Sequence, residues 1–229
     1  MIVSNWLSDN YIEVFGAITG IIYIFLEIRQ TIWLWPIGII TSAVYIWVFF
    51  TGKLYADMSL QVYYLVISCL GWYWWAKGTG HRAQGMGHRA QSSEFRSQGI
   101  RYKEEVAGGR EGELHVTRIT LKTGLVLAAV FSVLFIVMWF ILDRLTDSPV
   151  PGWDSFITSL SIVATWMLAR KIYEHWLLWI VVNSVAVVLF LSRGLYPTVI
   201  LYVVYGIMSF IGLTAWKKTI RTELSISKK

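Results

Sequence analysis

The sequence predicts an all-α integral membrane protein, with seven transmembrane helices arranged as two parallel three-helix repeats and a linker helix between them (3+1+3). Three observations lead to this prediction. Apolar runs long enough to cross a bilayer recur along the chain, the chain matches itself at one ungapped offset of 141 residues, and basic residues collect on one side of the resulting topology. Internal repetition in a hydrophobic chain is typical of transporters built from two bundles that close around a site between them.

The apolar runs follow from composition and spacing. The chain is 56% hydrophobic and its mean hydropathy is +0.56, whereas soluble domains carry about 45–50% apolar residues. Because a helix needs roughly 20 residues to cross a bilayer, we expect spans at 11–28, 32–50, 57–76, 119–142, 153–169, 175–192 and 196–216. The N-terminus lacks the basic region and cleavage site of a signal peptide. The single cysteine, Cys69, excludes an internal disulfide and a cysteine-rich metal site, and no cofactor is expected.

The repeat determines how the chain is organised. The offset of 141 residues pairs identical residues of the first three and last three spans, among them Trp35 with Trp176, Tyr64 with Tyr205, Gly71 with Gly212 and Trp75 with Trp216. Three spans fused directly to three more would point in opposite directions, so the fourth span restores a parallel arrangement. The expected divisions are a first repeat at 1–76, a flexible cytoplasmic linker at 77–118, a linker transmembrane helix at 119–142, a second repeat at 153–218 and a cytoplasmic tail at 219–229.

The distribution of charge predicts the orientation. Of the 20 Lys and Arg residues, all but Lys53, Arg144 and Arg193 fall on one side of the seven-span topology. The positive-inside rule places that side in the cytoplasm, with the N-terminus outside and the C-terminus inside. The net charge of +6 then reflects topology, and nucleic acid is not an expected partner. The 77–118 segment is interpreted as a plain linker, with a contact to lipid headgroups or a regulatory contact as the alternative.

Polar residues within the spans mark the helix faces that turn away from lipid. In the third span a polar and aromatic stripe recurs at steps of three and four residues, through Asp57, Gln61, Tyr64, Ser68, Gly71 and Trp75. Asn183 lies on a comparable stripe of the sixth span. An amide is costly in hydrocarbon unless it finds partners, so Gln61 and Asn183 are expected to face the bundle interior and contact a solute. The alternative is that they join helices by hydrogen bonds.

Aromatic and acidic residues complete the candidate site. Six aromatic residues lie on or beside the inward stripes and are expected to form its walls: Trp35, Tyr64, Trp72, Trp179, Tyr202 and Tyr205. Asp57 lies near the outer end of the third span, where it either contacts a polar or cationic solute or caps the helix.

At these residues the chain resembles a known family. The stretches 35–38 (Trp-Pro-Ile-Gly), 52–57 (Gly-Lys-Leu-Tyr-Ala-Asp), 60–64 (Leu-Gln-Val-Tyr-Tyr) and 71–75 (Gly-Trp-Tyr-Trp-Trp), with 179–183 and 194–202 in the second half, closely resemble the PnuC family of nicotinamide riboside transporters. The resemblance covers the membrane portion and leaves out the 77–118 linker and the extreme termini.

What the resemblance implies is a seven-span protein with SWEET-like but longer repeats, in a bacterial inner membrane and as a homotrimer. It would take up an unphosphorylated vitamin precursor, which a cytoplasmic nicotinamide riboside kinase then traps. Relatives with the same fold carry thiamine or riboflavin, so these vitamins, and a SWEET-like sugar, are the alternative substrates.

The residues themselves suit nicotinamide riboside. Its pyridinium cation suits aromatic faces, and its carboxamide and ribose suit Gln61, Asn183 and the tyrosine hydroxyls. No Lys or Arg lies in the middle of any expected span, so a phosphorylated nucleotide would lack a counter-charge.

Other mechanisms and classes fit less well. Glu13 and Glu27 lie at opposite ends of the first span and the histidines lie in loops or at span ends, so no buried proton relay is expected and facilitated diffusion is the expected mechanism. A rhodopsin-like receptor would need a lysine in the seventh span for retinal. A membrane enzyme would need a nucleophile, an acid and a base at matching depth. The seventh span holds no lysine, and the central spans supply mostly hydroxyls, amides and aromatic groups, so the chain is not expected to be a receptor of that kind or an enzyme.

Overall fold

The structure, a computed structural model, describes residues 11–51, 55–77, 114–146 and 149–226. These ranges contain seven α-helices. In chain order they are α2 (Tyr11–Ile28), α3 (Leu34–Thr51), α4 (Tyr55–Lys77), α6 (Leu121–Leu145), α7 (Pro151–Ala169), α8 (His175–Ser192) and α9 (Tyr196–Ile226). Side chains are described for these residues except 11–14, 55–57 and 223–226. The all-helical class is confirmed, and each expected span coincides with one helix.

Four of these helices, α3, α6, α8 and α9, are long and apolar enough to cross a membrane by length and composition alone. Helix α6 has no buried residue, which suits a helix surrounded by lipid. Helix α7 differs because neighbouring helices cover it. It buries hydroxyl-bearing residues, among them Ser155, Ser159, Ser161 and Thr165, so it depends less on an apolar surface.

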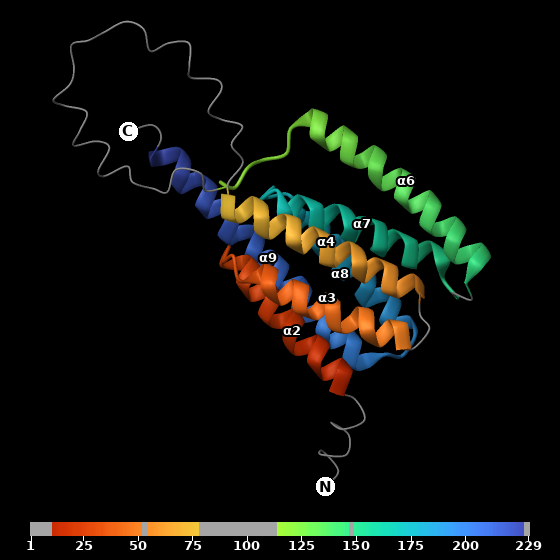
Figure 1. The fold of residues 1–229 in the computed structure, drawn as a ribbon. Coiled ribbons are helices and arrows are strands. Elements are labelled where there is room, and N and C mark those ends of the chain that lie inside the picture. Colours follow the sequence, from red (N-terminus) through yellow and green to blue (C-terminus); the bar gives the residue numbers. More distant parts are fainter. Residues whose placement is uncertain (1–10, 52–54, 78–113, 147–148, 227–229) are drawn as a thin grey trace, which may run out of the picture.

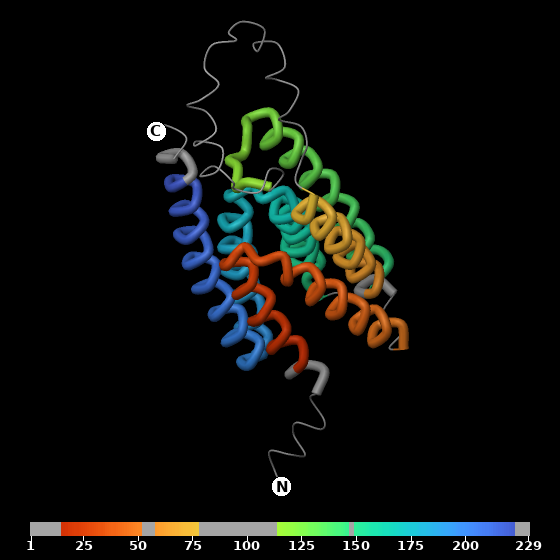
Figure 2. The backbone as a smooth tube through the Cα atoms, turned by 60° about the vertical axis from the view of Figure 1, so that its left-hand side comes forward, coloured from red at the N-terminus to blue at the C-terminus, as the bar shows by residue number. Residues whose placement is uncertain are grey.

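The six helices of the two repeats form a closed ring, visible as one bundle in Figures 1 and 2. Around the ring α2 packs on α3, α3 on α4, α4 on α7, α7 on α8, α8 on α9 and α9 on α2. Helix α6 contacts α7 and lies at the outside of the bundle (Figure 1). The first helix of each repeat therefore packs on the third helix of the other, as expected for two repeats related by a common axis.

The two repeats reproduce each other's backbone. Among the described residues, Gln30 and Lys171 are the non-glycine residues with positive φ, at 54° and 50°. They are related by the offset of 141 and occupy the turns that follow α2 and α7. A left-handed conformation is costly for residues with a side chain, so its recurrence at equivalent positions shows that both turns follow the same path.

The tryptophans also match between repeats. Trp35 meets Trp75 edge to face with 5.4 Å between ring centroids, and Trp176 meets Trp216 in the same way at 5.9 Å. All four are buried. Edge-to-face pairs of this kind add stability beyond the area they bury, and here they join the second and third helices within each repeat.

Two hydrogen bonds connect the repeats to each other. The Trp75 Nε1 donates to the Ala169 main-chain oxygen at 3.2 Å, and the Trp216 Nε1 donates to the Glu27 main-chain oxygen at 3.1 Å. Ala169 and Glu27 lie at or near the C-terminal ends of α7 and α2. Each bond thus connects the third helix of one repeat to the C-terminal end of the first helix of the other.

The structure adds detail to two of the expected divisions. The expected tail at 219–229 is helical as far as Ile226, because no Gly or Pro follows Lys217 to end α9. The last residues of the expected flexible linker are ordered: Leu114 and Val116 are buried, and Thr117 exchanges main-chain hydrogen bonds with the turn before α8. Their alternation of apolar and polar residues is a strand pattern that the linker prediction overlooked. Residues 78–113 lie outside the described residues.

Candidate functional site: a polar cavity inside the helix ring

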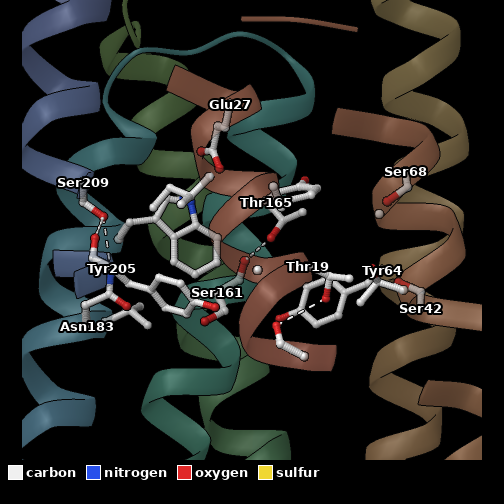
Figure 3. A pocket seen from close by; sticks show the side chains of 18 of the residues that line it. Thr19, Glu27, Ser42, Tyr64, Ser68, Ser161, Thr165, Asn183, Tyr205 and Ser209 are labelled. Carbon is white, nitrogen blue, oxygen red and sulfur yellow. Dashed lines mark hydrogen bonds between the residues drawn. The ribbon is translucent and has the colours of Figure 1, made fainter. Parts of the chain in front are cut away.

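The ring encloses a cavity of about 340 Å³ (Figure 3). All six helices of the repeats line it, and α6 contributes no lining residue. Small-molecule sites occupy roughly 300–1,000 Å³, so the cavity has room for one small solute. The described lining carries amide, hydroxyl and aromatic side chains and one carboxylate, and it contains neither Lys nor Arg.

The lining is itself nearly symmetric. Most lining residues form pairs related by the offset of 141, including Ser42 with Asn183, Gln61 with Tyr202 and Tyr64 with Tyr205. The exceptions are Thr19, Tyr23 and Glu27, which follow one face of α2 at steps of four. Their counterparts in α7 are Leu160, Ala164 and Leu168, none of which lines the cavity. Helix α2 alone therefore adds a polar stripe to an otherwise two-fold chamber.

Six of the nine residues expected at the site come together in this cavity. They are Gln61, Tyr64, Trp179, Asn183, Tyr202 and Tyr205, drawn from α4, α8 and α9. Figure 3 shows Tyr64 on one side of the cavity and Asn183 and Tyr205 on the other. The helix faces that carry the predicted polar and aromatic stripes therefore meet at one place.

The other three expected residues are placed differently. Trp35 is fully buried between α3 and α4 against Gly71 and does not line the cavity. Trp72 is 44% exposed on α4, because one residue beyond Gly71 turns the helix by about 100° away from the inward face. Asp57 lies in α4, but its side chain is outside the described set.

Asn183 both joins helices and faces the cavity. Its Nδ2 donates to the Ser209 hydroxyl on α9 at 3.2 Å, and Ser209 in turn donates to the Tyr205 main-chain oxygen at 2.8 Å. An amide offers two N–H donors and a carbonyl acceptor. One donor is therefore engaged in helix packing, and the rest of the amide is left for a solute.

The Trp179 indole carries a donor with no partner. Its Nε1 is buried and lacks a hydrogen bond within the described part of the chain, and the residue lines the cavity. Buried polar atoms are normally satisfied. The Trp35 and Trp176 Nε1 atoms are also unpaired, but neither residue lines the cavity. Of the three tryptophans, only Trp179 lines the cavity.

A buried acid–base pair reaches the cavity through Glu27, although the sequence predicted no buried proton relay and placed both residues at span ends. Glu27 lines the cavity, and its Oε1 lies 3.0 Å from the His175 Nε2. The side chains are 4% and 0% exposed. Both residues lie at helix ends, but the Trp176 and Trp216 rings pack on His175 and cover it. Comparison across the repeat would have exposed the pair, because Glu27 and His175 correspond to Leu168 and Leu34.

The site carries no sign of a metal centre: across the described ranges, no cluster of three or more His, Cys, Asp or Glu residues is placed to hold a metal ion. The described polar groups instead suit an organic solute that makes hydrogen bonds and stacks on aromatic rings.

A ring of apolar helices around a nearly symmetric polar chamber defines a multi-pass membrane transporter for a small solute. The chain belongs to the nicotinamide mononucleotide transporter family, whose family model matches residues 10–218. This match and the relatives described next confirm the sequence resemblance to the PnuC family.

Individual relatives agree with this assignment. The nicotinamide riboside transporter PnuC of Escherichia coli (strain K12) is 26% identical over 212 residues, which cover 93% of this chain and 87% of that protein. The riboflavin/roseoflavin transporter RibM of Streptomyces davaonensis is 25% identical over 222 residues, covering 93% and 92%. The crystal structure of the vitamin B3 transporter PnuC shares the fold, with a TM-score of 0.66 and 24% identity over 96% of this chain and 86% of that one.

Proposed function

We propose that this protein carries nicotinamide riboside across a bacterial inner membrane by facilitated diffusion. The solute would occupy the cavity inside the helix ring, between the amides of Gln61 and Asn183 and the aromatic walls formed by Tyr64, Trp179 and Tyr205. The observation that supports this proposal most directly is the composition of the described lining, which combines amides, hydroxyls and aromatic faces with one carboxylate and no basic side chain.

Each part of the solute has a suitable group in the lining. The pyridinium ring suits the faces of aromatic residues. The carboxamide and the ribose hydroxyls can bond the amides of Gln61 and Asn183, and the unpaired Trp179 Nε1 offers a donor to a carbonyl or hydroxyl oxygen. A phosphate would meet the Glu27 carboxyl group and no cation, so the unphosphorylated riboside is favoured over the mononucleotide.

Riboflavin is the second candidate, because the riboflavin/roseoflavin transporter RibM matches this chain nearly as well as the nicotinamide riboside transporter of Escherichia coli. Thiamine and a simple sugar remain alternatives from the sequence. Glu27 favours the two cations, nicotinamide riboside and thiamine, over uncharged riboflavin or sugar.

We also propose an orientation in the membrane, retention of the solute by phosphorylation in the cytoplasm, and an oligomeric state. The N-terminus lies outside and the C-terminus in the cytoplasm, as the positive-inside rule requires. A cytoplasmic kinase that phosphorylates nicotinamide riboside prevents its return, because the product finds no counter-charge in the cavity. The protein assembles as a homotrimer and is not an enzyme.

Calorimetric titration of the purified protein with nicotinamide riboside, thiamine, riboflavin and glucose tests the substrate. We expect nicotinamide riboside to bind most tightly and to raise the unfolding temperature, because a ligand that binds the native state stabilises it. A response to riboflavin or glucose alone would contradict the proposal.

A further inference from the structure

The buried pair of Glu27 and His175 has no counterpart across the repeat, and the symmetric part of the cavity does not require it. In Figure 3 Glu27 lies at the upper edge of the cavity, above Ser161, Thr19 and Asn183. Its carboxyl group therefore reaches a chamber whose other described lining groups are amides, hydroxyls, aromatic rings and small or apolar residues.

The hydrogen bonds of His175 determine how many protons the pair holds. The His175 Nδ1 lies 2.6 Å from the Ile172 main-chain oxygen, which can only accept, so Nδ1 carries a hydrogen. The Nε2 lies 3.0 Å from the Glu27 Oε1, and a bond between them needs one further hydrogen. That hydrogen makes either an imidazolium beside a carboxylate or a neutral imidazole beside a carboxylic acid. In both forms the pair has no net charge.

A cation that enters this cavity meets an uncharged pair and adds one buried positive charge. Burial of an uncompensated charge is strongly unfavourable. If the shared proton leaves for water, Glu27 becomes an anion, His175 stays neutral, and the carboxylate turns from Nε2 toward the cation. One positive charge enters and one leaves, so the net charge of the cavity does not change.

We propose that Glu27 and His175 select a cationic solute by exchanging their shared proton for it. This inference rests on the proposed function, because the pyridinium ring of nicotinamide riboside is such a cation. The proton is rebound when the solute leaves. With equal pH on both sides of the membrane this exchange supplies no driving force, so it is compatible with facilitated diffusion.

The surroundings of Glu27 leave the pair as the group that changes charge. Among the described titratable side chains, His175 on α8 is hydrogen-bonded to it and Tyr23 on α2 interacts with it electrostatically, while Tyr64 on α4 in turn interacts with Tyr23. On α9 the neighbouring contact is the Trp216 Nε1, bound to the Glu27 main-chain oxygen. Lys171, in the turn before α8, lies with its Nζ over the Trp75 ring at 4.4 Å. Tyrosine hydroxyls stay protonated near neutral pH.

The effect of the solute's charge on binding can be measured separately from the effect of its shape by comparing two forms of one solute. Nicotinamide riboside is a cation, and its 1,4-dihydro form has nearly the same shape without the charge. Calorimetric titration of the full chain in two buffers of different ionisation enthalpy counts the protons released on binding. We expect about one proton released per nicotinamide riboside and none per dihydro form, with the affinity for the cation rising by up to about tenfold per pH unit.

Variants locate the effect. Glu27→Gln should abolish proton release and weaken nicotinamide riboside binding by roughly tenfold or more, while the dihydro form binds as before. Glu174→Gln is the matched control, because Glu174 lies outside the cavity and its side chain accepts from the Ile119 main-chain N–H at 2.9 Å, which Gln can also do. It should keep the wild-type proton count.

The outcomes are distinct. Nicotinamide riboside binding without proton release, or equal release by both forms, overturns this inference and leaves the proposed function intact. Failure of the wild-type protein to bind nicotinamide riboside overturns the proposed function and this inference with it. The comparison of the two solute forms uses the wild-type protein, so it decides the matter even if Glu27→Gln does not fold.

Discussion

Gly71 of α4 lies so close to the indole ring of Trp35 on α3 that a Cβ atom at Gly71 would overlap the ring. The second repeat makes the same contact between Gly212 and Trp176. In each repeat the absence of a side chain lets the third helix approach the second, and it buries the tryptophan completely. This packing explains why both glycines and both tryptophans recur at the offset of 141 residues.

Alanine at either glycine should therefore destabilise the fold. We expect Gly71→Ala and Gly212→Ala each to lower the free energy of unfolding by roughly 1–3 kcal/mol, because a rigid ring must shift to admit the methyl group. Thermal unfolding of the purified protein measures the effect. Gly152→Ala is the control, since no atom lies within 4 Å of a Cβ there. Equal stability of all three variants would contradict the packing account.

The two amides should be needed for binding. Gln61→Leu and Asn183→Leu are each expected to abolish nicotinamide riboside binding, because leucine has a similar size and cannot donate or accept hydrogen bonds. Ser184→Ala is the control, since Ser184 follows Asn183 but is exposed on α8. Titration calorimetry on monodisperse protein makes the comparison. Unchanged affinity in both leucine variants would show that the amides serve only helix packing; if those variants do not fold, Gln61→Glu and Asn183→Asp replace them.

The unpaired Trp179 donor should contribute to affinity without contributing to stability. Trp179→Phe is expected to weaken nicotinamide riboside binding by about two- to tenfold, the value of one hydrogen bond. Trp176→Phe also removes an unpaired buried Nε1, but Trp176 does not line the cavity. Its affinity should stay at the wild-type level whatever happens to its stability. A larger loss of affinity in Trp176→Phe than in Trp179→Phe would place the solute elsewhere.

The orientation can be checked by labelling intact cells. A cysteine introduced in the 81–98 segment should be protected from an impermeant thiol reagent, whereas one near Lys53 or Ser148 should react. This expectation follows from the division of basic residues between the two sides. A protein in which Cys69 is replaced by serine provides the background. Strong labelling of the 81–98 segment from outside would reverse the assigned topology.

The fold and much of the cavity lining could be predicted from the sequence, because both depend on repeated local patterns. Apolar runs located the helices, and the offset of 141 required an extra crossing between the repeats. Gln61 and Asn183 were recognisable because an amide within an apolar span needs a polar environment. The sequence could not separate Trp35 from a residue that lines the cavity, because its burial depends on the contact with Gly71 of the neighbouring helix α4.

The burial of Glu27 and His175 was missed for a different reason. The two residues are 148 positions apart, and each ends or begins a span, where polar residues normally face water. Their burial results from the way α2, α8 and α9 meet under the Trp216 ring. In the sequence they are marked only by a break in the internal repeat, because the residue equivalent to each of them under the offset of 141 is a leucine.

Uptake into sealed vesicles tests the central claim most directly. The purified protein is reconstituted with equal pH, no sodium gradient and no membrane potential, and labelled nicotinamide riboside is followed inside. We expect protein-dependent entry of chemically unchanged solute that stops when the concentrations on the two sides are equal, because under these conditions no gradient is present to drive accumulation. Absence of entry, conversion to another product, or accumulation above the external concentration when a sodium gradient alone is then imposed would contradict facilitated transport of this solute.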